Sequence, residues 1–274
     1  MKNAFLTAPL CLALGLFAML PTALPANAGT KDDLVKTRPA TSDALPPGGQ
    51  TEESSFKDPV ERFIESNVLE TLYHEMAHAL IDKMNLPVFG PEEFAADYFA
   101  AILLDRVHDP DTTRQLVADV LASYRYDGRQ GNGVAWDEHG SAMQRYYNLA
   151  CLYYGADPDG RKGALTAFNL PDERADICPS EYEQANFAWG GILDELGEDA
   201  PGDSITLDWI LDKDSHLTRY VTQEVAALNA MLVLPEPIVV SVIPCGEVNA
   251  YYDPAKDEII ICTELSEHLA KIAP

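Results

Sequence analysis

The chain has 274 residues, of which 44 are acidic and 19 basic, and its formal net charge is −25 at pH 7. An electrostatic field of this sign repels nucleic acid and anionic lipid, so we expect neither as a partner. Residues 29–56 are rich in Pro, Gly, Ser and Thr, which predicts a disordered linker. The remaining residues, 57–274, are enough for one domain with a sizeable core.

The first 28 residues have the pattern of a signal peptide. Lys2 supplies the positive charge, residues 4–20 form an apolar core, and Ala26-Asn27-Ala28 is a small-x-small cleavage site. The apolar run is too short and too interrupted for a membrane anchor. We therefore predict an exported protein, periplasmic or secreted, with no stable membrane anchor after signal cleavage.

Apolar residues recur at helical spacing from Val60 to Ile81. Within this run, Asn67 and Glu70 have the spacing of a capping box, which predicts that a helix starts there. Residues 59–65 would then form a separate short helix. Pro91 is followed by acidic residues, and this pattern predicts a second helix from Pro91 to about Asp105.

The first run contains His74-Glu75-Met76-Ala77-His78. Histidines four residues apart share one face of a helix, so both imidazoles can reach one metal ion. Glu75 can then reach a water molecule bound to that metal. The second predicted helix carries Glu93 and Asp97, which also share a face.

A catalytic zinc site usually has three protein ligands and one open position. We therefore expect Glu93 to be the third ligand and Asp97 to accept the second ring N–H of a ligating histidine. Ala95, Ala96 and Phe99 indicate that much of this helix is buried, and a buried carboxylate needs a partner. The alternative is an acidic helix start that faces water.

The later part of the chain reads as an alternation of helices and short strands. Residues 205–210 fit a strand and a short helix equally well. In chain order we predict a helix after Asp109-Pro110-Asp111, a loop from Tyr124 to Asp137, helices at about 141–154, 180–196 and 217–232, a strand at 238–243, and a hairpin of 248–252 with 258–261.

Four cysteines remain once the signal peptide is removed, and an even number in an exported chain suggests disulfides. Three pairings are possible. Cys245 and Cys262 flank the predicted hairpin, so sequence proximity favours a bond between them and, by exclusion, between Cys151 and Cys178. The alternative, a cysteine metal site, lacks the close Cys-x-x-Cys spacing.

His-Glu-x-x-His followed by Glu-x-x-x-Asp resembles the gluzincin metallopeptidases, the thermolysin-like group. Residues 66–81 are similar to a bacterial family of metallopeptidases, domain of unknown function 4344. The likeness continues through Asp137-Glu138-His139, Arg145, Asn148, Cys151 and the last hairpin. It implies an α+β, zincin-like domain that is mostly helical, with a small sheet and a C-terminal hairpin.

The same resemblance implies roles for two further groups. In gluzincins a histidine outside the metal motif donates a hydrogen bond to the oxyanion formed during peptide attack. His139 is the candidate here, with Arg145 in support or in contact with substrate; the alternative is a polar cluster that caps the next helix. Asn249-Ala250-Tyr251-Tyr252 resembles the Asn-Ala-aromatic edge strand that pairs with substrate in thermolysin-like enzymes. The alternative for this stretch is a plain hairpin.

Together these patterns predict a zinc-dependent peptidase that acts on peptide or protein substrates. One Zn²⁺ would be held by His74, His78 and Glu93, because two nitrogens and one carboxylate suit zinc best. Glu75 would act as general base. The alternative is a catalytically inactive zincin-like module that binds metal or protein. The intact Glu75 favours the peptidase, since a binding module does not need a carboxylate beside the water.

Overall fold

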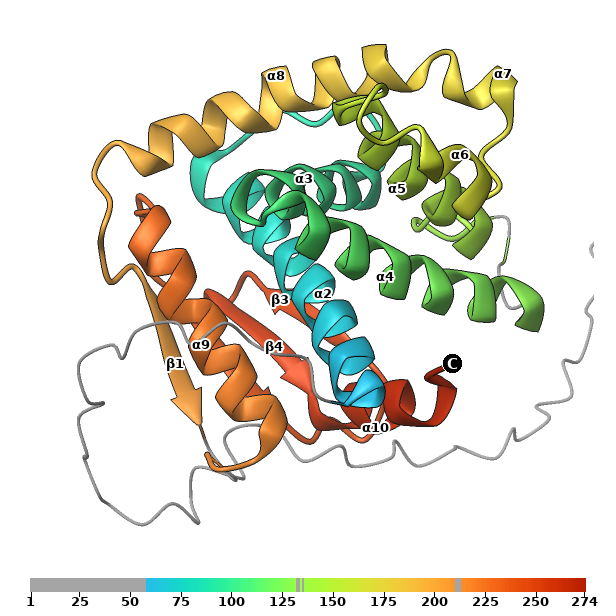
Figure 1. Cartoon of the computed structure of the whole chain (residues 1–274). Helices are drawn as coiled ribbons and strands as arrows, with labels where there is room; N and C mark the ends of the chain where they lie inside the picture. The colour runs from blue at the N-terminus through green and yellow to red at the C-terminus, as the bar shows by residue number, and fades with distance from the viewer. Residues whose placement is uncertain (1–57, 132–133, 135, 210–212) are drawn as a thin grey trace, which may run out of the picture.

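The computed structural model describes residues 58–131, 134, 136–209 and 213–274 (Figure 1). The predicted signal peptide at 1–28 and linker at 29–56 lie outside this part of the chain. The described part is mostly helical with one four-stranded sheet, which confirms the α+β class. Labelled as in Figure 1, the elements are α2 (Pro59–Met84), α3 (Glu92–Val107), α4 (Pro110–Gln130), α5 (Ala142–Ala156), α6 (Gly163–Ala167), α7 (Asp172–Ala175), α8 (Cys178–Gly197), β1 (Ile205–Trp209), α9 (His216–Met231), β2 (Ile238–Ile243), β3 (Ala250–Asp253), β4 (Glu258–Cys262) and α10 (Thr263–Ile272).

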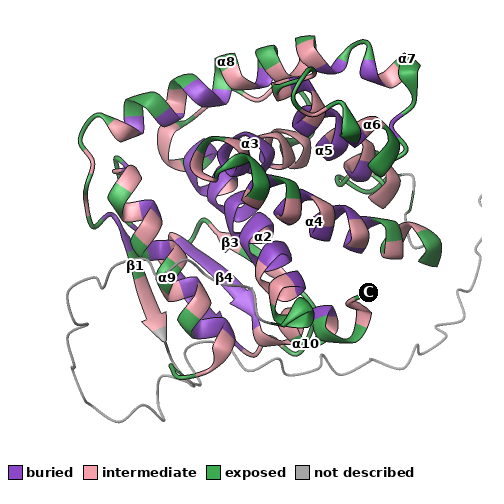
Figure 2. Cartoon of the chain, in the orientation of Figure 1, coloured by how far each residue is buried: buried purple, intermediate pink, exposed green. Residues whose placement is uncertain are grey.

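Helix α2 runs through the middle of the molecule and packs against α3, α4, α10 and the hairpin strand β3. Figure 2 shows its central turns buried around most of their circumference. Between Ser66 and Ile81 only Thr71 and His78 are not fully buried. A polar side chain in such a helix has little water to solvate it and must find a partner inside the protein.

The predicted capping box within α2 is wrong, because the helix is continuous from Pro59. Its N-cap is Asp58, whose side chain accepts a hydrogen bond from the backbone N–H of Val60. The Asn67 side chain instead accepts a hydrogen bond from Ser123 Oγ on α4 at 2.6 Å. Glu70 accepts one from the hydroxyl of Tyr124 at 2.6 Å. Both side chains therefore join α2 to α4.

The predicted loop from Tyr124 is also wrong in its first half, because α4 continues to Gln130. Gly128 does not break this helix; its missing side chain leaves room for Met143 of α5, whose sulfur lies 2.8 Å from an ideal Cβ position. The helix ends at Gly131, which has a left-handed φ of 69°. Helix α5 begins with a capping box formed by Ser141 and Gln144.

The sheet has the strand order β1-β2-β4-β3. Strands β1, β2 and β4 are parallel, and β3 is antiparallel to β4, as expected of the predicted hairpin. Residues 205–209, which fitted two structures equally, form strand β1 beside α9. Strand β4 is buried along its whole length, whereas β3 lies at the edge of the sheet next to α2.

Two disulfides, Cys151–Cys178 and Cys245–Cys262, confirm the predicted pairing. The first joins α5 to α8, and the second brackets the β3–β4 hairpin. Among the described residues, none of the helices combines the length and the apolar character needed to cross a bilayer.

Candidate metal centre and cleft

His74, His78 and Glu93 converge on one point between α2 and α3. The Nε2 atoms of the two histidines lie 3.2 Å apart. Glu93 Oε2 lies 3.0 Å from His74 Nε2, and Glu93 Oε1 lies 3.6 Å from His78 Nε2. The convergence arises because the histidines share one face of α2 while Glu93 stands in the first turn of α3, which packs across that face.

These separations fit a tetrahedral metal ion. Zinc bonds to nitrogen and oxygen are about 2.0–2.2 Å long, which places tetrahedral ligands about 3.3–3.5 Å from one another. The three measured distances, 3.0, 3.2 and 3.6 Å, lie around this value. The donor set of two imidazoles and one carboxylate therefore has a chemistry and a spacing that could hold a metal ion.

Asp97 supports His74 from the side away from this point. Its Oδ1 lies 3.0 Å from His74 Nδ1, so the Nε2 atom is left to face the other ligands. Arg145 donates to both oxygens of Asp97, from Nε at 3.1 and 3.0 Å, and its guanidinium also stacks over Tyr124. Arg145 is not among the residues that line the cleft, and its guanidinium contacts Asp97; its expected role towards substrate or oxyanion stays a prediction.

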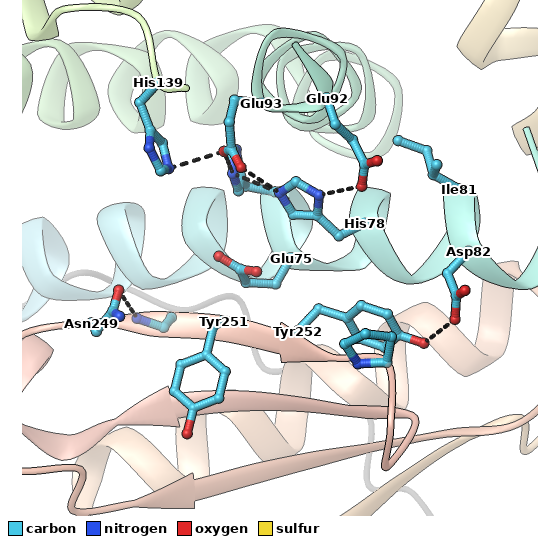
Figure 3. A pocket seen from close by; sticks show the side chains of 13 residues that line it. Glu75, His78, Ile81, Asp82, Glu92, Glu93, His139, Asn249, Tyr251 and Tyr252 are labelled. Atoms are coloured by element: carbon cyan, nitrogen blue, oxygen red, sulfur yellow. Dashed lines mark hydrogen bonds and ion pairs between the residues drawn. The ribbon is translucent and has the colours of Figure 1, made fainter. Parts of the chain in front are cut away.

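Glu92 plays the corresponding part for His78, and sequence reasoning missed it. Its Oε1 lies 2.7 Å from His78 Nδ1 (Figure 3). The sequence pattern assigns a role to Glu93 but none to Glu92, whereas the two carboxylates contact opposite edges of the His78 imidazole. The available signal was the direct adjacency of Glu92 to the predicted ligand Glu93.

His139 reaches the same cluster from the segment before α5. Its Nε2 lies 3.0 Å from Glu93 Oε2, and its Nδ1 lies 3.1 Å from Asp137 Oδ1. The side chain is 52% exposed, far more than that of His74 at 7%. His74, Glu93 and His139 could also hold a metal as a group of three. His139 is therefore within reach of both the metal position and a molecule that enters from solvent.

The charges of this cluster depend on one another. Burial disfavours the imidazolium form of His74, but hydrogen bonds to Asp97 and Glu93 outweigh it and raise its pKa to about 10. Burial likewise acts against the Glu93 carboxylate, yet the imidazoles of His139, His74 and His78 hold its pKa well below the usual range. A divalent cation would take the place of the shared protons in this cluster.

Glu75 lies beside the cluster but forms no part of it. Figure 3 shows its carboxylate between α2 and the hairpin strand. The residue is 8% exposed, and burial raises the pKa of its carboxyl, while the two histidines and the backbone N–H of Tyr252 oppose the rise. A carboxylate with a raised pKa is a stronger base than an ordinary one.

A cavity of about 520 Å³ extends from the cluster along β3. Its walls include Glu75, Asn249 and Ala250, so the predicted base and the predicted substrate strand share one cleft. The carbonyl of Asn249 accepts from Cys262 of β4, and backbone groups alternate in direction along a strand. The backbone of Ala250 and Tyr252 therefore points away from β4, towards the cleft.

Two hydrogen bonds hold this strand edge in place, and neither was predicted from the sequence. The Asn249 side chain accepts from the backbone N–H of Ala250 at 3.0 Å. The hydroxyl of Tyr252 donates to Asp82 on α2 at 2.8 Å, across 170 positions of sequence. The two sides of the cleft, β3 and α2, are therefore linked by a hydrogen bond.

A model of the protein family named domain of unknown function 4344, described as "Putative metallopeptidase", matches residues 47–193 and 210–273. The match includes all residues of the metal cluster and the cleft. No curated protein and no solved structure matches the chain.

Proposed function

The chain belongs to the metallopeptidase family named domain of unknown function 4344, and from this premise we propose that it is a zinc-dependent peptidase that works outside the cytoplasm. The observation that carries the proposal is the joint placement of three donor side chains, a separate buried carboxylate and the outer edge of a sheet around one cleft.

In this proposal His74, His78 and Glu93 hold one Zn²⁺. When bound, zinc lowers the pKa of a water molecule to about 7 and polarises a substrate carbonyl. Glu75 accepts the proton of the attacking water and later delivers it to the leaving amine. Its burial and raised pKa support both transfers. His139, whose Nε2 faces the cluster and whose ring is half exposed, donates to the developing oxyanion.

The substrate in this proposal is an extended peptide. Strand β3 pairs with β4 on one side, and its other side borders the cleft. A peptide added along that side pairs with the backbone of Ala250 and Tyr252, as in other cases of strand addition. Asn249, at the start of the strand, holds the N–H of Ala250 in position until substrate arrives.

Export is supported by the two disulfides, because such bonds persist in oxidising compartments such as the periplasm or the extracellular space. The predicted signal peptide agrees with this assignment. The working place of the enzyme in our proposal is therefore the periplasm or the medium.

The first prediction tests the general base. We expect Glu75→Gln to retain one equivalent of zinc, since Glu75 is not a ligand, and to lose at least about 10²-fold in kcat on casein or a peptide library. Glu93→Ala should bind zinc more weakly. Metal analysis of the purified proteins and the cleavage rates decide both points.

Equal rates for Glu75→Gln and the parent protein would contradict the assignment of Glu75. If the parent protein binds zinc but cleaves no peptide in the library, the alternative of an inactive binding module replaces the peptidase. If it binds no zinc at all, the metal assignment of His74, His78 and Glu93 is wrong.

A further inference from the structure

A second cavity of about 810 Å³ lies on the other side of the α3 N-terminus. It is formed by the segment between α2 and α3 together with faces of α3, α5 and α8. Its apolar side chains include Leu86, Val88, Phe89, Phe94, Trp189 and Ile192. We call this cavity the apolar groove. The proposed reaction does not use it.

The apolar groove adjoins the cleft. Ile81 of α2 lines both cavities, and the neighbouring residues Pro91 and Glu92 line the groove and the cleft respectively. In Figure 3, Ile81 lies beside Glu92 at the end of the cleft opposite His139. A peptide side chain that passes Ile81 would therefore move from the cleft towards the groove.

The rim of the groove bears an exposed apolar side chain. Phe89 is 98% exposed. It precedes Gly90, whose φ of 145° is a backbone conformation that residues with side chains rarely adopt. This turn keeps Phe89 at the mouth of the groove. Burial of a phenylalanine side chain is favourable by about 1.5–3 kcal/mol, and a ligand that covers Phe89 would gain part of this free energy.

The distance from the cluster sets which residue of a peptide can reach the groove. Ile81 lies three residues beyond His78 on α2, which is about 4.5 Å along the helix axis. An extended peptide advances about 3.3 Å per residue. The side chain that passes Ile81 thus belongs to a residue about one or two positions from the bond at the metal.

We propose that the apolar groove is the specificity subsite of the enzyme and takes one large apolar side chain, aromatic or aliphatic, of a peptide whose backbone lies along β3. This inference rests on the proposed function, because it assumes that the cleft holds a peptide. Its occupant is a substrate side chain because the groove adjoins, at Ile81, the cleft that the peptide occupies.

The test measures binding apart from cleavage. Short alanine-based peptides, each with a single Phe walked through the sequence, and the matched peptides with Asn, are titrated against the Glu75→Gln protein by fluorescence anisotropy. We expect one Phe position to bind about tenfold or more tightly than its Asn counterpart, as is usual for an apolar pocket. Cleavage of the same peptides by the parent protein tests the proposed function separately.

The substitution Ala188→Trp is designed to fill the groove with a large side chain. Ala188 lines it yet is exposed on α8, so a larger side chain there does not disturb the core. In the Glu75→Gln background this change should abolish the preference for Phe and leave the affinity of the Asn peptides unchanged. The matched control is Gln184→Trp, which adds the same side chain to an exposed position of α8 outside the groove. This control should keep the preference.

Three results would overturn the inference. One is equal affinity for Phe and Asn peptides at every position. Another is a Phe preference that survives Ala188→Trp. The third is a parent protein that sediments as a dimer and becomes a monomer on Ala188→Trp, because the groove would then be covered by a second copy. None of these depends on cleavage, so a failure of the groove is distinguishable from a failure of the peptidase.

Discussion

At the scale of single residues, Glu92 differs from the other carboxylates around the metal cluster. Its side chain is 44% exposed, whereas those of Glu93 and Asp97 are 14% and 10% exposed. It nevertheless lies 2.7 Å from His78 Nδ1 and fixes which nitrogen of that ring faces the cluster. Because Glu92 contributes little to the core, its effect on metal binding can be measured without loss of the fold.

We predict that Glu92→Ala lowers zinc affinity by about tenfold or more, since removal of a carboxylate that orients a ligating histidine has effects of this size. Competition with a chromophoric chelator measures the affinity. The control is Glu183→Ala, which removes another exposed glutamate, on α8 and outside the cleft. Identical zinc affinities for the two variants would show that His78 needs no partner at Nδ1.

At the scale of elements, the contact between α5 and α8 depends on a glycine. A Cβ on Gly155 would lie 2.2 Å from the backbone oxygen of Cys178, which starts α8 and is bonded to Cys151 of α5. Gly191, in the exposed face of α8, has nothing within 4 Å of its Cβ position. The two glycines thus differ in packing and share a helical backbone.

Gly155→Ala should therefore lower the free energy of unfolding by about 1–3 kcal/mol through overpacking. Gly191→Ala should raise it by up to about 1 kcal/mol, because alanine favours the helix. Urea denaturation measures both. Stabilisation by Gly155→Ala would mean that α8 moves away from α5 without cost.

The elements that could be predicted from the sequence are those set by neighbouring residues. The face shared by His74 and His78 follows from helical spacing, and the start of α3 follows from Pro91 and the acidic residues behind it. The capping box could not be judged in this way, because Asn67 finds its partner, Ser123, 56 positions away.

The candidate site divides along the same line. His74 and His78 were named from helical spacing and Glu93 from the need for a third ligand, and the structure brings the three together. The position of Arg145 behind Asp97, 48 positions apart, is a product of how α5 packs on α3. Periodicity within one helix carries no information on such contacts between helices.

At the scale of the whole molecule, two disulfides link elements that also pack against each other. Their sequence separations are 27 and 17 residues. Each closure contributes about 3 kcal/mol on the loop-entropy model. Together they would contribute about 6 kcal/mol, which is a large share of the 5–15 kcal/mol typical of a domain.

We predict that reduction of both bonds lowers the urea midpoint strongly and makes the protein unfold at a moderate temperature. The measurement compares urea curves of the oxidised and reduced protein with the zinc content held constant. The double variant Cys245→Ala/Cys262→Ala isolates the bond around the hairpin and should account for about half of the loss. Superimposable curves would show that the bonds do not contribute to stability.

The side of β3 that borders the cleft has a consequence for what such an enzyme could digest. A guest polypeptide must offer backbone donors and acceptors that are not already engaged in its own helices or sheets. In folded globular proteins most backbone N–H and C=O groups are already hydrogen-bonded, whereas in tails, nicked loops and damaged chains they are accessible. Under the proposed function, substrates would be selected first by whether their backbone is unfolded and only then by their side chains. A folded protein in the same compartment would not be cleaved.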